Sequence, residues 1–151
     1  GTADWFLSDK VPVRDAAGEL VALAGVSRDL HAPAHEDPRL GRLAAAVETL
    51  RRHFAEPLRI APLARAAGMS LSRFERLMKG VLRVSPRQFL TQLRIEAAAV
   101  LLRSGTRPLA EVAVAVGFGD QPTFSRQFKA ATGMSPLAYR RLAGDCAKPA
   151  A

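Results

Sequence analysis

Apolar residues recur every three or four positions along most of the chain, and this spacing predicts helices rather than strands. In 39–55 the apolar stripe consists of Leu40, Leu43, Val47, Leu50 and Phe54. In 85–104 the run Ser85-Pro86-Arg87-Gln88 has the form of a capping box with proline at the first helical position. We expect a long helix there, about 30 Å in length, with a buried stripe of Phe89, Leu93, Ala97, Val100 and Leu101.

The segment 108–139 predicts two short helices around a tight turn. Apolar residues at helical spacing end at Gly117, where a left-handed turn residue is favourable only for glycine. Asp120 can cap the next helix, and Pro122 lies in its first turn, where a missing N–H costs little. Phe124 and Phe128 are four residues apart and mark its buried face.

This arrangement occurs twice, which constrains the architecture more than either copy alone. In the earlier copy we expect Pro62 to open the first helix, Gly68 to form the turn, and Ser70 or Leu71 to begin the second helix. Five residues recur fifty positions later: Phe74, Arg76, Lys79, Ser85 and Pro86 match Phe124, Arg126, Lys129, Ser135 and Pro136. Gly68 matches Gly117, which lies forty-nine positions later rather than fifty. The extra residue of the second copy therefore lies in its turn.

The repeated pattern resembles the AraC-type DNA-binding domain, and the run GFGDQPTFSRQFKAATGMSP at 117–136 is the most specific part of the match. The resemblance covers about 39–142 and implies a mainly α fold: two homeodomain-like helix-turn-helix subdomains joined by a long linker helix. The sequence departs from the family at Arg59 and Pro108, where a Ser or Thr cap is common. It departs again at Arg83, which stands where the second copy has Gly133.

Residues on the free faces of the second helices are the candidate DNA contacts. They are Ser72, Arg73, Glu75, Arg76, Lys79 and Arg87 in and after the first copy, and Gln121, Pro122, Thr123, Ser125, Arg126 and Lys129 in the second. Arginine can pair with guanine through two hydrogen bonds, and glutamine can do so with adenine. Proline can make only an apolar contact, for example with a thymine methyl. Lys79, Lys129 and Arg87 suit phosphates better. An intramolecular ion pair, with Glu75 or Asp120 for example, is the alternative role of Arg76 and Arg126.

The charge is divided unevenly along the chain. Residues 1–38 hold three Lys/Arg and seven Asp/Glu, a net charge of −4, whereas 39–151 hold nineteen and seven, a net charge of +12. The basic part contains the repeat, as phosphate binding requires. The lone cysteine, Cys146, excludes an intrachain disulfide, and no zinc, cofactor or catalytic motif is present. His31 and His35 lack a third ligand, so we expect neither a metal nor a cofactor, and no enzyme.

Residues 4–29 predict a β-hairpin, with turn residues at 15–18 between two strand-like runs. The run also resembles the last two strands of a PAS sensor domain. We therefore expect a truncated PAS-like hairpin at 1–30, a linker at 31–38, the double helix-turn-helix domain at 39–143 and a flexible tail at 144–151. Because the chain begins at Gly1 rather than Met, we expect it to be a fragment of a longer protein.

Together these features predict a bacterial, cytoplasmic transcription regulator that binds double-stranded promoter DNA. RNA polymerase is an expected second partner, and a homodimer would form through the missing upstream PAS region. No apolar run reaches transmembrane length, so no membrane partner is expected. The alternative is a signal-sensing PAS-type interaction module of a larger regulator, in which ligand or partner binding is the main activity.

Overall fold

The computed structural model describes residues 5–14, 20–30 and 38–146. The chain divides into two compact units, Gly1–Gly41 and Arg42–Ala151. Several predicted features lie outside the described residues. They are the turn at 15–18, the linker at 31–38 apart from Pro38, with His31 and His35, and residues 147–151 of the tail.

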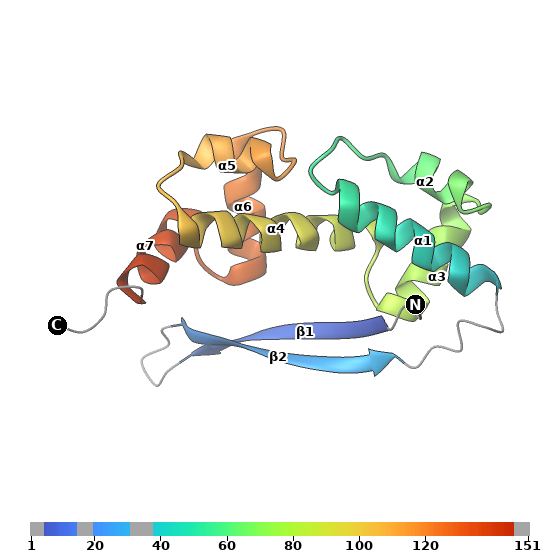
Figure 1. The fold of residues 1–151 in the computed structure, drawn as a ribbon, viewed down its shortest axis with the longest axis horizontal. Helices are drawn as coiled ribbons and strands as arrows, with labels where there is room; N and C mark the ends of the chain where they lie inside the picture. Colours follow the sequence, from blue (N-terminus) through green and yellow to red (C-terminus); the bar gives the residue numbers. More distant parts are fainter. Residues whose placement is uncertain (1–4, 15–19, 31–37, 147–151) are drawn as a thin grey trace. The chain divides into compact units, whose positions relative to one another are not determined.

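In the first compact unit, β1 (Trp5–Arg14) pairs with β2 (Leu20–Leu30) in an antiparallel ladder (Figure 1). Trp5 lies opposite Leu30, and the register runs evenly until it shifts between Val13 and Arg14.

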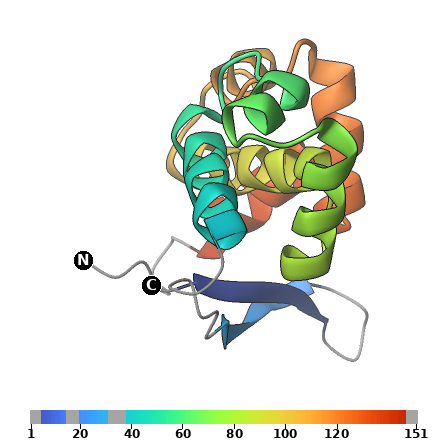
Figure 2. The ribbon, with the colours of Figure 1, turned by 90° about the vertical axis from the view of Figure 1, so that its right-hand side faces the viewer.

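The remaining described residues are mainly helical, as the sequence predicts. The helices are α1 (Pro38–His53), α2 (Ile60–Ala66), α3 (Leu71–Leu82), α4 (Pro86–Ser104), α5 (Leu109–Ala115), α6 (Gln121–Thr132) and α7 (Pro136–Cys146). Figure 1 shows α1, α2 and α3 toward one end of α4 and α5, α6 and α7 toward the other. Figure 2 shows α3 and α6 on the same side of α4, with α1 on the opposite side. Among these helices, none has the length and apolar character needed to span a membrane.

The two helix-turn-helix copies have the same turn. In the first, the N–H of Gly68 donates to the Arg65 carbonyl at 2.8 Å, and the N–H of Met69 donates to the Ala64 carbonyl at 3.0 Å. In the second, Gly117 donates to Val114 at 3.0 Å and Phe118 donates to Ala113 at 2.9 Å. Both patterns are Schellman motifs, which place glycine at positive φ after the helix. The φ angles of +68° at Gly68 and +88° at Gly117 agree with this assignment.

An aromatic series forms much of the core around the second copy. Phe118, Phe124, Phe128 and Tyr139 are buried, and successive ring centroids lie 5.4, 5.6 and 5.3 Å apart in tilted or edge-on contacts. Such geometry is favourable because it brings the positive edge of one ring to the negative face of the next. The series connects the turn, the helix α6 and the helix α7. Phe74 and Met78 are likewise fully buried on α3.

The predicted buried stripe of α4 is wrong at Val100, which is 53% exposed. The buried positions are instead Pro86, Leu90, Ile95, Ala98 and Leu102, and the other predicted positions, Phe89, Leu93, Ala97 and Leu101, are half-buried. The prediction assumed one buried face, whereas α4 contacts α3, α5, α6 and α7 along its length. A helix with neighbours on several sides buries residues outside a single 3.6-residue stripe.

Two helix boundaries also differ from the prediction. The helix α2 begins at Ile60 rather than at Pro62. Proline is tolerated at this third position because the first N–H groups of a helix have no intrahelical partner. The helix α7 continues to Cys146, three residues into the segment predicted as a flexible tail. Gly144 lowers helix propensity by about 1 kcal/mol relative to alanine, which does not by itself end a helix.

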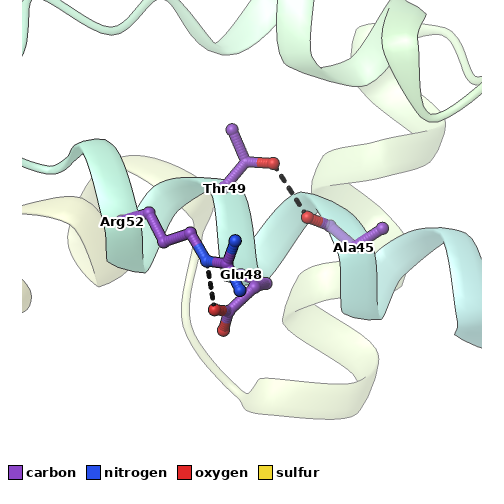
Figure 3. A network of polar contacts seen from close by, with 4 residues as sticks. All are labelled: Ala45, Glu48, Thr49 and Arg52. Atoms are coloured by element: carbon purple, nitrogen blue, oxygen red, sulfur yellow. Dashed lines mark hydrogen bonds and ion pairs between the residues drawn. The ribbon is translucent and has the colours of Figure 1, made fainter.

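The exposed side of α1 carries local polar contacts, drawn in Figure 3. The Nε of Arg52 donates to Glu48 at 2.7 Å, and the hydroxyl of Thr49 donates to the Ala45 carbonyl at 2.9 Å. These groups satisfy one another within a single helix, so the basic side chain of Arg52 is held on α1.

The ends of α3 and α6 give a matched test of backbone strain. Both C-cap residues have a left-handed backbone conformation, and each donates its N–H to the carbonyl of the lysine four residues earlier. One is Arg83, with φ +62°, and the other is Gly133, with φ +81°. A non-glycine residue in this region is strained by about 1–2 kcal/mol.

We expect Arg83→Gly to raise the free energy of unfolding by about 1 kcal/mol, because it removes the left-handed strain. Gly133→Ala should lower the free energy of unfolding by a similar amount. Urea denaturation of both variants measures these effects. A destabilised Arg83→Gly protein would contradict this account of the first copy.

Candidate nucleic-acid interface

The outward face of α3 carries most of the candidate contacts of the first copy. Ser72, Arg76 and Lys79 are exposed and lie, by helical periodicity, on the face opposite buried Phe74 and Met78, and exposed Glu75 lies at the edge of this face. Arg73 is also exposed, one position before Phe74. The buried aromatic residue thus fixes the rotation of α3 about its axis, and this rotation presents the polar groups to the outside.

The helix α6 presents its residues in the same way. Gln121, Pro122, Arg126 and Lys129 are exposed, while Thr123 and Ser125 are half-buried. Phe124 and Phe128 are fully buried on the other face. Because α3 and α6 lie on the same side of α4, the structure brings the two candidate sets to one side of the helical unit (Figure 2). Arg87 is exposed in the first turn of α4 and belongs to neither helix.

Each candidate recognition helix begins at a side-chain cap, but the caps differ. Ser70 accepts a hydrogen bond from the N–H of Arg73 at 3.4 Å. Asp120 accepts one from the N–H of Thr123 at 2.6 Å and brings a negative charge to the helix N-terminus. Carboxylates are favoured at this position by the hydrogen bond and by the helix dipole.

The cap of α6 extends into a short side-chain network. The hydroxyl of Thr123 donates to Asp120 at 3.0 Å and accepts from Nη2 of Arg126 at 3.4 Å. The hydrogen bond from the Thr123 N–H, then that from its hydroxyl, lowers the pKa of Asp120, and the charge of Arg126 adds to this effect. Arg126 is therefore oriented toward the start of α6 and keeps further N–H donors free for a ligand.

The first copy lacks this network. Arg73 stands where the second copy has Thr123, so the residue three positions before Arg76 is a cation rather than a hydroxyl. In the part of the chain that the structure describes, neither an ion pair nor a hydrogen bond joins Arg76 to Glu75. The alternative role for the two arginines was an intramolecular ion pair. Arg126 meets it in part, because it interacts with Asp120 through its charge and through the Thr123 hydroxyl, whereas Arg76 does not interact with Glu75 in this way. The sequence suggested the Asp120 cap but not the link through the Thr123 hydroxyl.

No group of three or more His, Cys, Asp or Glu side chains within the described ranges is arranged to hold a metal ion. The surface offers hydrogen bonding and charge from guanidinium, ammonium, amide, hydroxyl and carboxylate groups.

Comparison with known proteins identifies the fold. The model of the helix-turn-helix domain family matches residues 63–142, which is more than half of the chain. The chain belongs to the AraC-type helix-turn-helix family. The matched region begins in α2 and ends in α7, so it contains both copies and the connecting helix α4.

Individual relatives cover the same part of this AraC-type chain. An AraC-like transcription regulator of Streptomyces antibioticus is 38% identical over 99 residues, which are 66% of the chain and 33% of the relative. The regulatory protein SoxS of Salmonella typhimurium is 32% identical over 94 residues, 62% of the chain and 88% of SoxS. The chain spans about a third of the length of the first curated relatives that it matches.

Among solved structures, the DNA-binding domain of the global transcriptional factor AdpA, in complex with a target DNA, superposes with a TM-score of 0.67. It is 29% identical in sequence, and the match covers 70% of this chain and 96% of that one.

The Asp120 cap predicts a pH-dependent stability. Because the pKa of Asp120 is lowered in the folded state, its stabilisation is complete above the unfolded pKa of about 4 and is lost as pH falls through the lower folded value. Asn is an equally good capping residue that does not titrate.

The stability of the natural chain relative to Asp120→Asn should therefore be constant from pH 7 to about 5 and should decline below about pH 4. Thermal melts of both proteins across this range measure the difference. If the difference does not change with pH, the folded carboxylate lacks the hydrogen bonds assigned to it.

Proposed function

We propose that this chain is the DNA-binding part of a sequence-specific transcription regulator, in which α3 and α6 enter successive major-groove segments of a promoter. One observation carries the proposal: two capped helices, each with a buried aromatic face and a polar or basic outer face, lie on the same side of α4. The helix-turn-helix places its second helix in the major groove. The net charge of +12 in residues 39–151 favours a polyanion.

The length of α4 suits this arrangement. Its 19 residues span about 28 Å at 1.5 Å per residue. Successive major-groove segments on one face of B-DNA are about 34 Å apart. A helix of this length can therefore hold two recognition helices about one DNA turn apart.

Each side chain has a role suited to its chemistry. Arg76 and Arg126 pair with guanine, Gln121 pairs with adenine, and Pro122 contacts a thymine methyl. Glu75 accepts from a cytosine amine, and the hydroxyls of Ser72 and Ser125 contact base edges. Phosphate contacts come from Arg73, Lys79, Arg87 and Lys129. The hydroxyl of Thr123 already donates to Asp120, so its contribution to base contacts is through Arg126.

The acidic N-terminal segment has a separate role in this proposal. The segment 1–30, which contains β1 and β2, belongs to the C-terminal end of a PAS-type sensor domain, and residues 38–146 form the DNA-binding domain. The paired strands β1 and β2 and the net charge of −4 over residues 1–38 support this division. The full-length protein would act in the cytoplasm, dimerise through its upstream PAS region and contact RNA polymerase.

Binding selection on randomised DNA tests the proposal. The chain should enrich a bipartite site, and the logarithm of its affinity should fall steeply with the logarithm of salt concentration. A steep salt dependence without sequence preference would contradict the proposal, because it would show that the chain binds polyanions non-specifically. A preference for one short site would contradict the use of both recognition helices.

The arginine and lysine of α6 should have different effects. Arg126→Ala should weaken binding to the preferred site by about 1–3 kcal/mol and relax the preference at one base pair. Lys129→Ala should weaken all sequences by similar factors and lower the salt slope by about one phosphate contact. Binding titrations at several salt concentrations, on the selected site and its single-base variants, separate the two effects.

Arg52→Ala is the matched control for this experiment. It removes one positive charge from α1, on the side of α4 opposite α3 and α6, so the base preference should not change. If Lys129→Ala alters base preference and Arg126→Ala weakens all sites equally, α6 has been assigned the wrong rotation in the groove.

The hairpin segment should be dispensable for binding. Removal of residues 1–37 leaves the whole of α1 and deletes a net charge of −4, so affinity for DNA should stay similar or rise slightly. Titration of the shortened chain on the selected site measures this. A large loss of affinity by a shortened chain that still melts cooperatively would assign a DNA-binding role to the hairpin.

A further inference from the structure

The chain leaving α1 is bound by a single side chain of α4. Arg94 donates from Nε to the carbonyl of Phe54 at 2.8 Å and from Nη2 to the carbonyl of Glu56 at 3.0 Å. Carbonyls at the end of a helix have no intrahelical partner, so a cationic donor there is favourable. The two bonds come from one planar guanidinium, whose fixed geometry determines where these carbonyls lie.

The same guanidinium reaches the second helix-turn-helix copy. The Cζ of Arg94 lies 5.8 Å from the centroid of the Phe118 ring, which follows the turn glycine Gly117. Partial burial lowers the pKa of Arg94, and an arginine stays charged despite such a shift. Arg94 thus connects three segments that are far apart in the sequence: the exit of α1, the helix α4 and the second turn.

At Gly117 the exit of α1 also meets the second turn directly. A Cβ atom at this glycine would lie 2.7 Å from the carbonyl oxygen of Ala55 and 2.9 Å from its carbonyl carbon. The side chain of Phe54 packs against the core that contains Phe124 and Phe128. The end of α1 is therefore fixed to the second copy by backbone, aromatic and guanidinium contacts.

The other end of α1 reaches the first copy. There Nη1 of Arg42 lies 3.3 Å from the position of a Cβ at Gly68, the glycine of the first turn. Arg51 of α1 also lies over the ring of Phe89 on α4, 5.9 Å from its centroid. The helix α1 is thus a second connection between the two turns, beside the covalent connection through α4.

We propose that Arg94 is a positioning residue that holds the two helix-turn-helix copies in one relative orientation and thereby sets the half-site spacing that the protein accepts. The spacing part of this proposal rests on the proposed DNA-binding function, whereas the orientation part does not. One inserted base pair moves a half-site by about 3.4 Å and rotates it by about a tenth of a turn. Only a rigid pair of recognition helices rejects such a change.

The orientation is tested without DNA by pulsed electron–electron double resonance, which measures the distance distribution between two spin labels. The labels are attached at Ser72→Cys on α3 and Ala131→Cys on α6, after Cys146→Ser removes the native thiol. We expect one narrow distance distribution, which should broaden in Arg94→Met, a variant of similar length without hydrogen-bond donors. Phe118→Leu, which removes the ring under the guanidinium, should broaden it less. Arg103→Met removes a charge from an exposed position of α4 and should leave it narrow.

The spacing is tested on selected sites with one base pair added or removed between the half-sites. The natural chain should discriminate against these sites, and Arg94→Met should reduce this discrimination by about tenfold, the scale of one net hydrogen bond. The salt slope should not change, because Arg94 donates to protein carbonyls rather than to phosphates. Arg94→Lys keeps a cationic donor and should recover part of the discrimination. A purely structural role would instead weaken all spacings equally.

The outcomes separate the two proposals. If the natural chain selects no DNA sequence, the proposed function fails, and the distance distributions still decide on the orientation. If the distributions and the spacing profile are unchanged in Arg94→Met, the role of Arg94 is overturned. If Arg94→Met shows no cooperative unfolding in a thermal melt, Phe118→Leu decides. An unchanged distance distribution between the spin labels in Phe118→Leu then overturns the proposal.

Discussion

The close approach of Ala55 to Gly117 is the contact on which the arrangement of the helical unit depends. The Ala55 carbonyl occupies the space that any side chain at position 117 would need, and the local φ of +88° already favours glycine. One residue therefore satisfies two independent requirements, a Schellman turn and a backbone contact between distant segments. Without this glycine, neither the start of α6 nor the end of α1 could keep its position.

The two copies share a backbone but differ in how they hold their arginines. In the second copy, Asp120 caps α6 and connects through Thr123 to Arg126. In the first copy, Ser70 supplies a neutral cap, and Arg73 replaces the hydroxyl that would orient Arg76. Pre-organisation lowers the entropy lost on binding. We therefore expect α6 to discriminate among bases more sharply than α3.

Much of the fold could be predicted because its determinants are local. Positive-φ glycines, capping residues and phenylalanines four apart act within one or two turns of helix, and these predictions agree with the structure at Gly68, Ser85 and Phe124. The missed features depend on segments far apart in the sequence. Arg94 lies thirty-eight to forty residues from its carbonyl partners, and no short-range pattern indicates such a contact. The exposure of Val100 follows likewise from which neighbours surround α4.

Methylation interference on a selected site tests the central claim most directly, because it reports contacts at guanine N7 in the major groove. The account predicts two clusters of interfering guanines, about 10 base pairs apart on one face of the duplex. It also predicts that Arg76→Ala and Arg126→Ala each remove interference from a different cluster. A single cluster, or two clusters on opposite faces of the DNA, would contradict the proposal that α3 and α6 occupy successive major-groove segments together.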